Sequence, residues 1–288
     1  MLSRTRARLC AVVMAAAAAA ACGRGIGLLS PPYEYEEDLT LSLDGSATLV
    51  VNASIPALIA LHGLPLNPDP RTRADDLRQR LRDVYTSPYA EVMRVNTWTK
   101  YGRRFVGVRL RIRDIHALPG AAPFAWSSYD LHQEGGHHVF RHTLRAATTP
   151  PGSVAAAGWR GDELIAFRVH LPSRVLFYNA RDVRDPSRIR TIDRGNIITW
   201  EQRLADRLAN QPIAYAEDRT PNVMETRMDS QSILYRTLWL FGLAFGAAIA
   251  VLALLIWLTM RRGRTEAVGR GVSQSALDPG SSSHHPRS

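Results

Sequence analysis

The chain has 288 residues, and its 36 lysines and arginines outnumber its 26 aspartates and glutamates, for a net charge of +10. This length accommodates one or two domains with a buried core. More than half of the excess positive charge lies at the two ends of the chain, as expected for a membrane protein, which argues against nucleic-acid binding. Both cysteines, Cys10 and Cys22, stand near the N-terminus, which excludes a disulfide or a catalytic thiol in the rest of the chain.

Residues 1–22 are predicted to form an export signal. Three arginines precede the apolar stretch 9–21, which ends in small side chains and is too short to span a bilayer. Cys22 follows alanines, as the lipid-modified cysteine of bacterial lipoproteins follows small residues, but the usual leucine of that motif is absent. Two outcomes stay open, lipidation of Cys22 and ordinary cleavage within the alanine run. The Arg and Ala bias, with Lys100 as the single lysine, is typical of a GC-rich bacterial genome.

The segment 23–230 is predicted to be an extracytoplasmic domain, and it begins with strands. Alternating polar and apolar residues on both sides of Asp44-Gly45 are typical of a β-hairpin. A second hairpin is expected to join 91–98 to 105–113, where large apolar residues alternate with glycine and arginine.

Two helices are expected between these hairpins. The first covers 54–61 and stops at Gly63. The second begins with Asp69 as its cap and Pro70 at its first position, and it ends before Pro88.

Five later segments alternate as strands do, and they lie at 126–132, 137–144, 164–171, 175–179 and 197–202. Residues 204–230 alternate poorly and are interpreted as a connection to the membrane. The predicted fold class is therefore α+β, a mostly antiparallel sheet with a helical layer, followed by one transmembrane helix.

The strongest pattern in the sequence is the apolar run 237–260, which contains no charged residue and no proline. It is long enough to cross a hydrocarbon core of about 30 Å as a helix. Three arginines follow within four residues, so the positive-inside rule places the basic tail, 261–288, in the cytoplasm. This tail is predicted to be disordered. We therefore expect a single-pass protein of the cell membrane with its main domain outside the cytoplasm.

Gly242 and Gly246 give this run a G-x-x-x-G spacing, which lets two helices approach closely. The spacing predicts a surface for a homodimer or for a helix of another membrane protein.

The stretch Ser187–Asp206 reads SRIRTIDRGNIITWEQRLAD and spaces a glycine and a tryptophan from Gly195 to Trp200. With the export signal, the Asp-Gly hairpin and the single C-terminal span, this layout resembles LppM-type and related bacterial envelope proteins of unknown function. The resemblance is one of architecture over most of the chain. It implies an envelope-associated role, such as lipid or glycolipid binding, and it supplies no catalytic residues.

The densest group of potential metal ligands comprises His132, Glu134, His137, His138 and His142. Imidazole and carboxylate groups suit zinc or copper. His138 and His142 share one strand face but lie roughly 13 Å apart at ~3.3 Å per residue, so the tighter pairing is His137 with His132 or Glu134. The simpler interpretation is a solvated, polar hairpin tip.

Two charged patterns each allow a binding interpretation and a simpler structural one. The acidic stretch 33–38, interleaved with tyrosines, is compatible with a cation or carbohydrate site, and its simpler interpretation is a charged strand. Arg109, Arg111 and Arg113 form a basic stripe that suits phosphate headgroups or an acidic partner, and its simpler interpretation is a solvated sheet face.

The sequence contains no serine-hydrolase elbow, zinc-protease motif, P-loop or dinucleotide fingerprint. We therefore predict no enzymatic activity and no cofactor. The predicted function is that of a membrane-anchored envelope protein whose domain binds a lipid, glycan or protein partner. The first alternative is an assembly subunit of a membrane protein complex, and the second is a metal-dependent hydrolase that uses the histidine hairpin.

Overall fold

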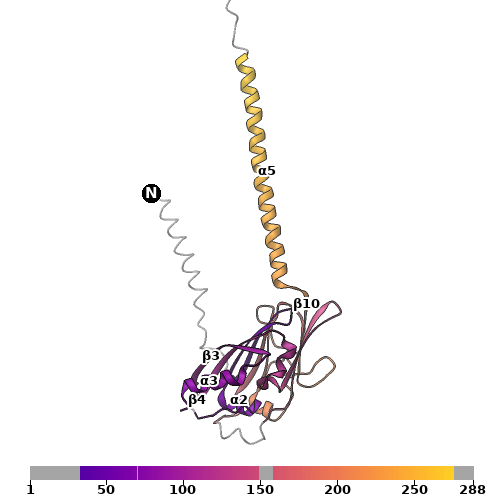
Figure 1. The fold of residues 1–288 in the computed structure, drawn as a ribbon. Helices are drawn as coiled ribbons and strands as arrows, with labels where there is room; N and C mark the ends of the chain where they lie inside the picture. Colours follow the sequence, from indigo (N-terminus) through magenta and orange to yellow (C-terminus); the bar gives the residue numbers. More distant parts are fainter. Residues whose placement is uncertain (1–32, 70, 149–157, 276–288) are drawn as a thin grey trace, which may run out of the picture.

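The computed structural model describes residues 33–69, 71–148 and 158–275, with side chains up to Met260. The predicted export signal and Cys22 lie outside the described residues and stay predictions. The described chain has two mostly antiparallel sheets, a few short helices and one long C-terminal helix (Figure 1). The predicted α+β fold class is confirmed.

The larger sheet has six strands in the order β3-β4-β2-β1-β7-β9. In chain order these are β1 (Tyr33–Leu41), β2 (Ala47–Ser54), β3 (Ala90–Lys100), β4 (Arg103–Ile112), β7 (Leu164–His170) and β9 (Ile197–Arg203). All neighbours are antiparallel except β1 and β7, which run parallel. The hairpin at Asp44-Gly45 is confirmed, with Leu39 opposite Leu49 and with Gly45 at a φ of 82° that favours glycine.

The smaller sheet has four antiparallel strands in the order β5-β6-β10-β8. They are β5 (Ser127–Glu134), β6 (His137–Leu144), β8 (Ser173–Tyr178) and β10 (Val223–Ser232). The assignment of 204–230 as a connection is wrong, because this stretch contains the short helix α4 (Leu204–Leu208) and the strand β10. The many polar residues of β10 interrupt the alternation of apolar and polar residues by which a strand is predicted. Glu225 is fully buried, with Arg141 and Arg227 as ion-pair partners.

Helix α2 (Ile55–His62) matches the first expected helix. The Ser54 hydroxyl caps it by accepting a hydrogen bond from the Ala57 N–H at 3.2 Å, and Gly63 ends it at a φ of 65°.

Helix α3 (Ala74–Tyr85) ends before Pro88 as expected, but it does not begin at Asp69. The Asp69 carboxylate accepts a hydrogen bond from the Arg71 N–H at 2.8 Å and forms a separate turn. Asp69 therefore marks a turn and not a helix start, because aspartate is favoured both in turns and at helix N-caps. Two short 3-10 helices, η1 (Ile115–Gly120) and η2 (Ala122–Phe124), precede β5.

Two different layers pack on one face of the six-stranded sheet, a helical layer and the four-stranded sheet. Helices α2 and α3 pack against β2, β3 and β4. The four-stranded sheet packs over β1 and β7, where Tyr129 of β5 reaches Glu37 of β1 and His142 of β6 contacts Phe167 of β7. We call the first region the apolar half of the interior and the second, together with α4, the polar half.

The most enclosed side chains of the apolar half are mainly aliphatic, and Tyr85 of α3 is buried beside them. The aliphatic ones include Leu49, Val51, Leu58, Leu61, Leu81, Val108 and Leu110. The polar half buries Glu37, His142, Gln202 and Arg207 beside its aromatic rings.

Helix α5 (Ile233–Ser275) follows β10 directly and projects away from the domain (Figure 1). Its segment Ile233–Met260 is long and apolar enough to cross a membrane and is not buried in the chain. This supports the expected span at 237–260. The helix continues to Ser275, so 261–275 are helical where a disordered tail was expected.

Candidate functional site

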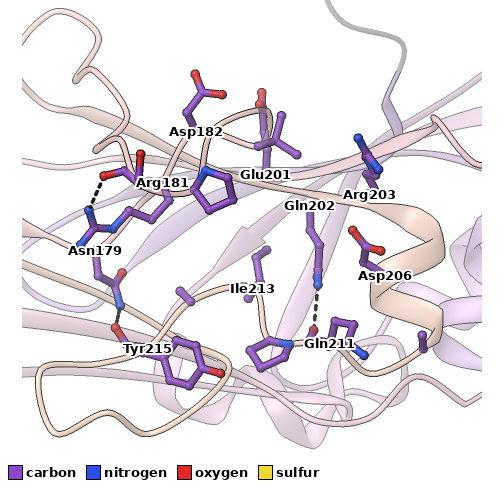
Figure 2. Close-up of a pocket in the computed structure, with 16 residues that line it drawn as sticks. Asn179, Arg181, Asp182, Glu201, Gln202, Arg203, Asp206, Gln211, Ile213 and Tyr215 are labelled. Atoms are coloured by element: carbon purple, nitrogen blue, oxygen red, sulfur yellow. Dashed lines mark hydrogen bonds between the residues drawn. The ribbon is translucent and has the colours of Figure 1, made fainter.

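A groove lies where the two sheets present their edge strands β9 and β8 (Figure 2). Its volume is about 900 Å³. It is lined by Asn179, Arg181, Asp182, Val183, Pro186, Ser187, Glu201, Gln202, Arg203, Asp206, Ala209, Gln211, Pro212, Ile213, Ala214 and Tyr215. A second hollow of about 750 Å³ shares Asn179, Arg181 and Tyr215 with it. We call the two together the edge groove.

Asn179 follows β8 and holds the two sheets together beside the edge groove. Its Oδ1 accepts hydrogen bonds from Trp200 Nε1 at 2.8 Å and from the Glu225 N–H at 3.0 Å. Its Nδ2 donates to the Val223 carbonyl at 2.7 Å and to the Tyr215 carbonyl. Because Trp200 lies in the larger sheet and Val223 and Glu225 lie in the smaller one, this amide fixes the two edges relative to each other.

The chemistry of the edge groove is mixed. Its lining side chains of positive charge are Arg181, Arg203 and Arg219, and those of negative charge are Asp182, Glu201, Asp206 and Glu217. Three large apolar side chains at the groove are each about half exposed, namely Leu176, Ile189 and Tyr215. Apolar and charged groups side by side suit an amphiphilic ligand.

Hydrogen bonds of Gln202 and Glu201 shape the groove. Gln202 Nε2 donates to the Gln211 carbonyl at 2.7 Å, which ties β9 to the loop after α4 (Figure 2). Glu201 accepts hydrogen bonds from Tyr33 and Arg190. Burial, together with the Glu201 carboxylate, raises the pKa of Tyr33 far above its usual value. Glu201 is therefore engaged by the protein and is not available as a free base.

Glu37 is the buried carboxylate at the centre of the polar half. It is 2% exposed and accepts hydrogen bonds from the Tyr35 hydroxyl and from the Tyr129 hydroxyl at 3.0 Å. Burial raises the pKa of Glu37 to about 7, although the two tyrosine hydrogen bonds oppose the rise. Its side chain therefore changes charge near neutral pH.

Arg207 is the buried cation of the polar half. It projects inward from α4, is fully buried, and has its guanidinium carbon 5.7 Å from the Trp126 ring. None of its three nitrogens has a hydrogen-bond partner among the described residues. Burial lowers the pKa of Arg207 to about 10, so it is charged at neutral pH.

Two buried imidazoles lie within electrostatic reach of this arginine. Burial, and secondarily the charge of Arg207, lowers the pKa of both His62 and His142 to about 3. Both imidazoles are therefore neutral at physiological pH. The ring of His62 lies 4.3 Å from that of Trp126, and the ring of His142 stacks on Tyr129 at 4.1 Å.

The structure divides the predicted histidine cluster between the exposed hairpin tip and the interior. His132 contacts Asp130 at 2.7 Å and Glu134 at 3.4 Å on the exposed face of β5. In the register of β5 and β6, Glu134 lies opposite His137, and His138 lies opposite Gln133. His142, by contrast, is buried in the polar half. Within the described ranges, no group of three or more His, Cys, Asp or Glu residues is placed to hold a metal ion.

Three of the four carboxylates of the acidic stretch in β1, all except Glu37, contact cations of the protein itself. Glu34 accepts from Arg103 at 2.6 Å, and Glu36 pairs with Arg168 at 2.8 Å. Asp38 contacts Arg168 at 3.3 Å. These contacts favour the charged-strand interpretation.

The basic stripe lies on the exposed side of β4. Arg109 and Arg113 are exposed, and Arg111 pairs with Glu91 at 3.1 Å. Gly242 and Gly246 both have open space around them in α5, and the predicted helix contact stays a prediction.

Sequence reasoning missed the buried groups of the polar half. A signal for Arg207 was present, because Leu204, Arg207 and Leu208 follow the i, i+3, i+4 spacing of a buried helix face. Glu37 also stands at an apolar-phase position of β1, between Tyr35 and Leu39.

No protein-family model matches the chain, and no curated protein matches it. Among solved structures, it is similar to the folded domain of LppM from Mycobacterium tuberculosis, determined by NMR. The identity is 12%, the TM-score is 0.34, and the match covers 73% of this chain and 98% of that one. This is the family that the layout of the sequence also resembles. The similarity is weak and concerns architecture alone, so no residue role is transferred from it.

Proposed function

We propose that this chain is a single-pass protein of the cell envelope whose domain, 33–232, lies outside the cytoplasm and binds a lipid or glycolipid in the edge groove. The apolar segment Ile233–Met260 of α5 and the arginines that follow this segment support the anchoring and the orientation. In this proposal the domain binds its ligand and does not transform it.

The observation that carries the proposal is the mixed lining of the edge groove. Leu176, Ile189 and Tyr215 offer exposed apolar surface for acyl chains or the apolar faces of sugar rings. Arg181 and Arg219 lie at the same hollow and suit a phosphate or carboxylate on the ligand. The described lining residues supply no histidine, and the carboxylate of Glu201 is already engaged, which supports binding over catalysis.

The test is native mass spectrometry of the full-length protein, purified from bacterial membranes in a neutral detergent. We expect a bound mass of lipid or glycolipid size. The variants Ile189→Asp and Tyr215→Ser change exposed groove side chains and are expected to lose most of that mass.

The matched control is Met93→Asp, which introduces a charge at an exposed apolar residue of β3, outside the groove lining. It is expected to retain the bound mass. A wild-type spectrum without any bound mass, or equal retention in all four proteins, contradicts binding in the groove. A co-purifying protein in place of a lipid supports the assembly-subunit alternative.

A further inference from the structure

The polar half contains a buried cation without a counterion. Arg207 is 0% exposed, and all three of its guanidinium nitrogens lack a hydrogen-bond partner among the described residues. A buried charge is costly unless it is paired, so proteins rarely retain one without a compensating group.

The carboxylates of the protein do not supply this group. Every buried carboxylate in the described part of the chain has other partners: Glu34 with Arg103 and Trp159, Glu37 with Tyr35 and Tyr129, Glu163 with the N–H groups of Arg160 and Gly161, and Glu225 with Arg141 and Arg227. Arg207 therefore has no internal anion to pair with in the described ranges.

Other buried polar groups near Arg207 in the described part of the chain also lack hydrogen-bond partners, and the indole and each neutral imidazole have one N–H to donate. Trp126 Nε1, His142 Nε2 and both ring nitrogens of His62 are buried and lack a hydrogen-bond partner among the described residues. The ring contacts join these residues, since Trp126 meets both the His62 ring and the Arg207 guanidinium. His142 and Trp126 both contact Phe167, at 5.3 and 5.8 Å between ring centroids.

We propose that Arg207, His62, His142 and Trp126 form an interior oxyanion site that takes a phosphate or carboxylate group. The planar guanidinium presents two parallel N–H groups that match either oxyanion. The indole N–H and one N–H from each neutral imidazole complete the donor set. This site lies on the inner side of α4, whereas Asp206 of the same helix lines the edge groove, so it does not depend on a ligand bound in that groove.

The test uses the full-length protein in neutral detergent at pH 7 with inorganic phosphate as the probe. Thermal unfolding is followed at increasing phosphate concentration, against chloride at matched ionic strength. We expect a saturable rise of Tm in the wild type and no phosphate-dependent rise in Arg207→Met. The control Arg80→Met removes an exposed arginine of α3, outside the edge groove, and is expected to keep the full response.

A second variant keeps the test decisive if Arg207→Met fails to fold. His142→Phe preserves the ring stacked on Tyr129 and removes one donor. Loss of one hydrogen bond to a charged group predicts half-saturation at a phosphate concentration higher by about tenfold or more.

Dihexanoyl phosphatidic acid, compared with dihexanoyl phosphatidylcholine, distinguishes a lipid headgroup from a free anion. A response to inorganic phosphate indicates a free oxyanion, and a response only to the phosphatidic acid indicates a headgroup. The proposal is overturned if the wild type responds to neither probe, or if Arg207→Met or His142→Phe responds as the wild type does.

Discussion

The apolar and polar halves of the interior lie on the same face of one six-stranded sheet, yet they differ in chemistry. The apolar half, under α2 and α3, is closed by aliphatic side chains such as Leu49 and Leu81. The polar half, under the four-stranded sheet, encloses Glu37 and Arg207. Burying hydrocarbon stabilises a fold, whereas burying ionisable groups without full pairing destabilises it. The first half therefore contributes stability, whereas the second gives up stability, as the proposed interior oxyanion site requires.

The largest expected effect is in the apolar half. Leu81→Ala removes a fully buried side chain of α3 and leaves a cavity, so we expect a loss of about 2–5 kcal/mol in the free energy of unfolding. Urea unfolding of the full-length protein in detergent measures it. The control Arg80→Ala, at an exposed position of the same helix, is expected to change stability by less than about 0.5 kcal/mol. Equal effects would remove the distinction on which the comparison depends.

The next effect depends on pH and belongs to Glu37. Its folded pKa of about 7 is raised above the ordinary value of 4.5. The stability that this carboxyl contributes is therefore present below pH 4.5 and is lost as the pH rises through 7. Glu37→Gln does not titrate, so its stability relative to the wild type is expected to rise by about 3 kcal/mol between pH 4.5 and 8.

Urea unfolding of both proteins across this pH range measures the difference. The contributions of His62 and His142 to the pH dependence of stability are the same in both proteins and cancel in the difference. A difference that stays constant with pH would show that Glu37 is ionised throughout and that the polar half is better solvated than its burial indicates.

A smaller effect is expected where the two sheets meet. Asn179→Ala removes the acceptor of Trp200 Nε1 and the donor to the Val223 carbonyl, leaving buried groups unpaired. We expect a loss of about 2 kcal/mol in stability. Faster hydrogen exchange in β8 and β9 than in β2 and β4 would accompany it. An effect spread evenly over both halves would contradict a local role for this amide.

The smallest effect is expected on the outer face. Arg111 and Glu91 form an exposed ion pair at 3.1 Å. Arg111→Ala is expected to change the free energy of unfolding by less than about 1 kcal/mol, because solvent screens such pairs. Urea unfolding at low and high salt checks this value. A loss comparable with that of Leu81→Ala would show that surface charge also maintains the fold.

Much of the fold could be predicted from the sequence, because local patterns determine it. The Asp44-Gly45 turn, the alternation in β4 and the apolar run of α5 each identify an element without tertiary information. β10 was missed because Glu225 looks exposed in the sequence and becomes buried only through its arginine partners.

The candidate sites depend on contacts between distant segments, which patterns do not show. The edge groove joins β8, β9 and the loop that ends near Tyr215. The proposed interior site combines His62 of α2, Trp126, His142 of β6 and Arg207 of α4, which ring contacts and Phe167 connect. Strand register divides the histidine cluster predicted from sequence density: Glu134 and His137 lie opposite each other at the tip of the hairpin, whereas His142 is buried.

The most direct test of the contrast between the two halves is the free energy of unfolding of Arg207→Met in phosphate-free and carboxylate-free buffer at pH 7. If the polar half holds an unpaired cation for a ligand, the methionine variant is expected to be more stable than the wild type by about 1–4 kcal/mol. A variant less stable than the wild type by a similar amount would contradict the account, because it would mean that Arg207 is already paired and serves only the fold.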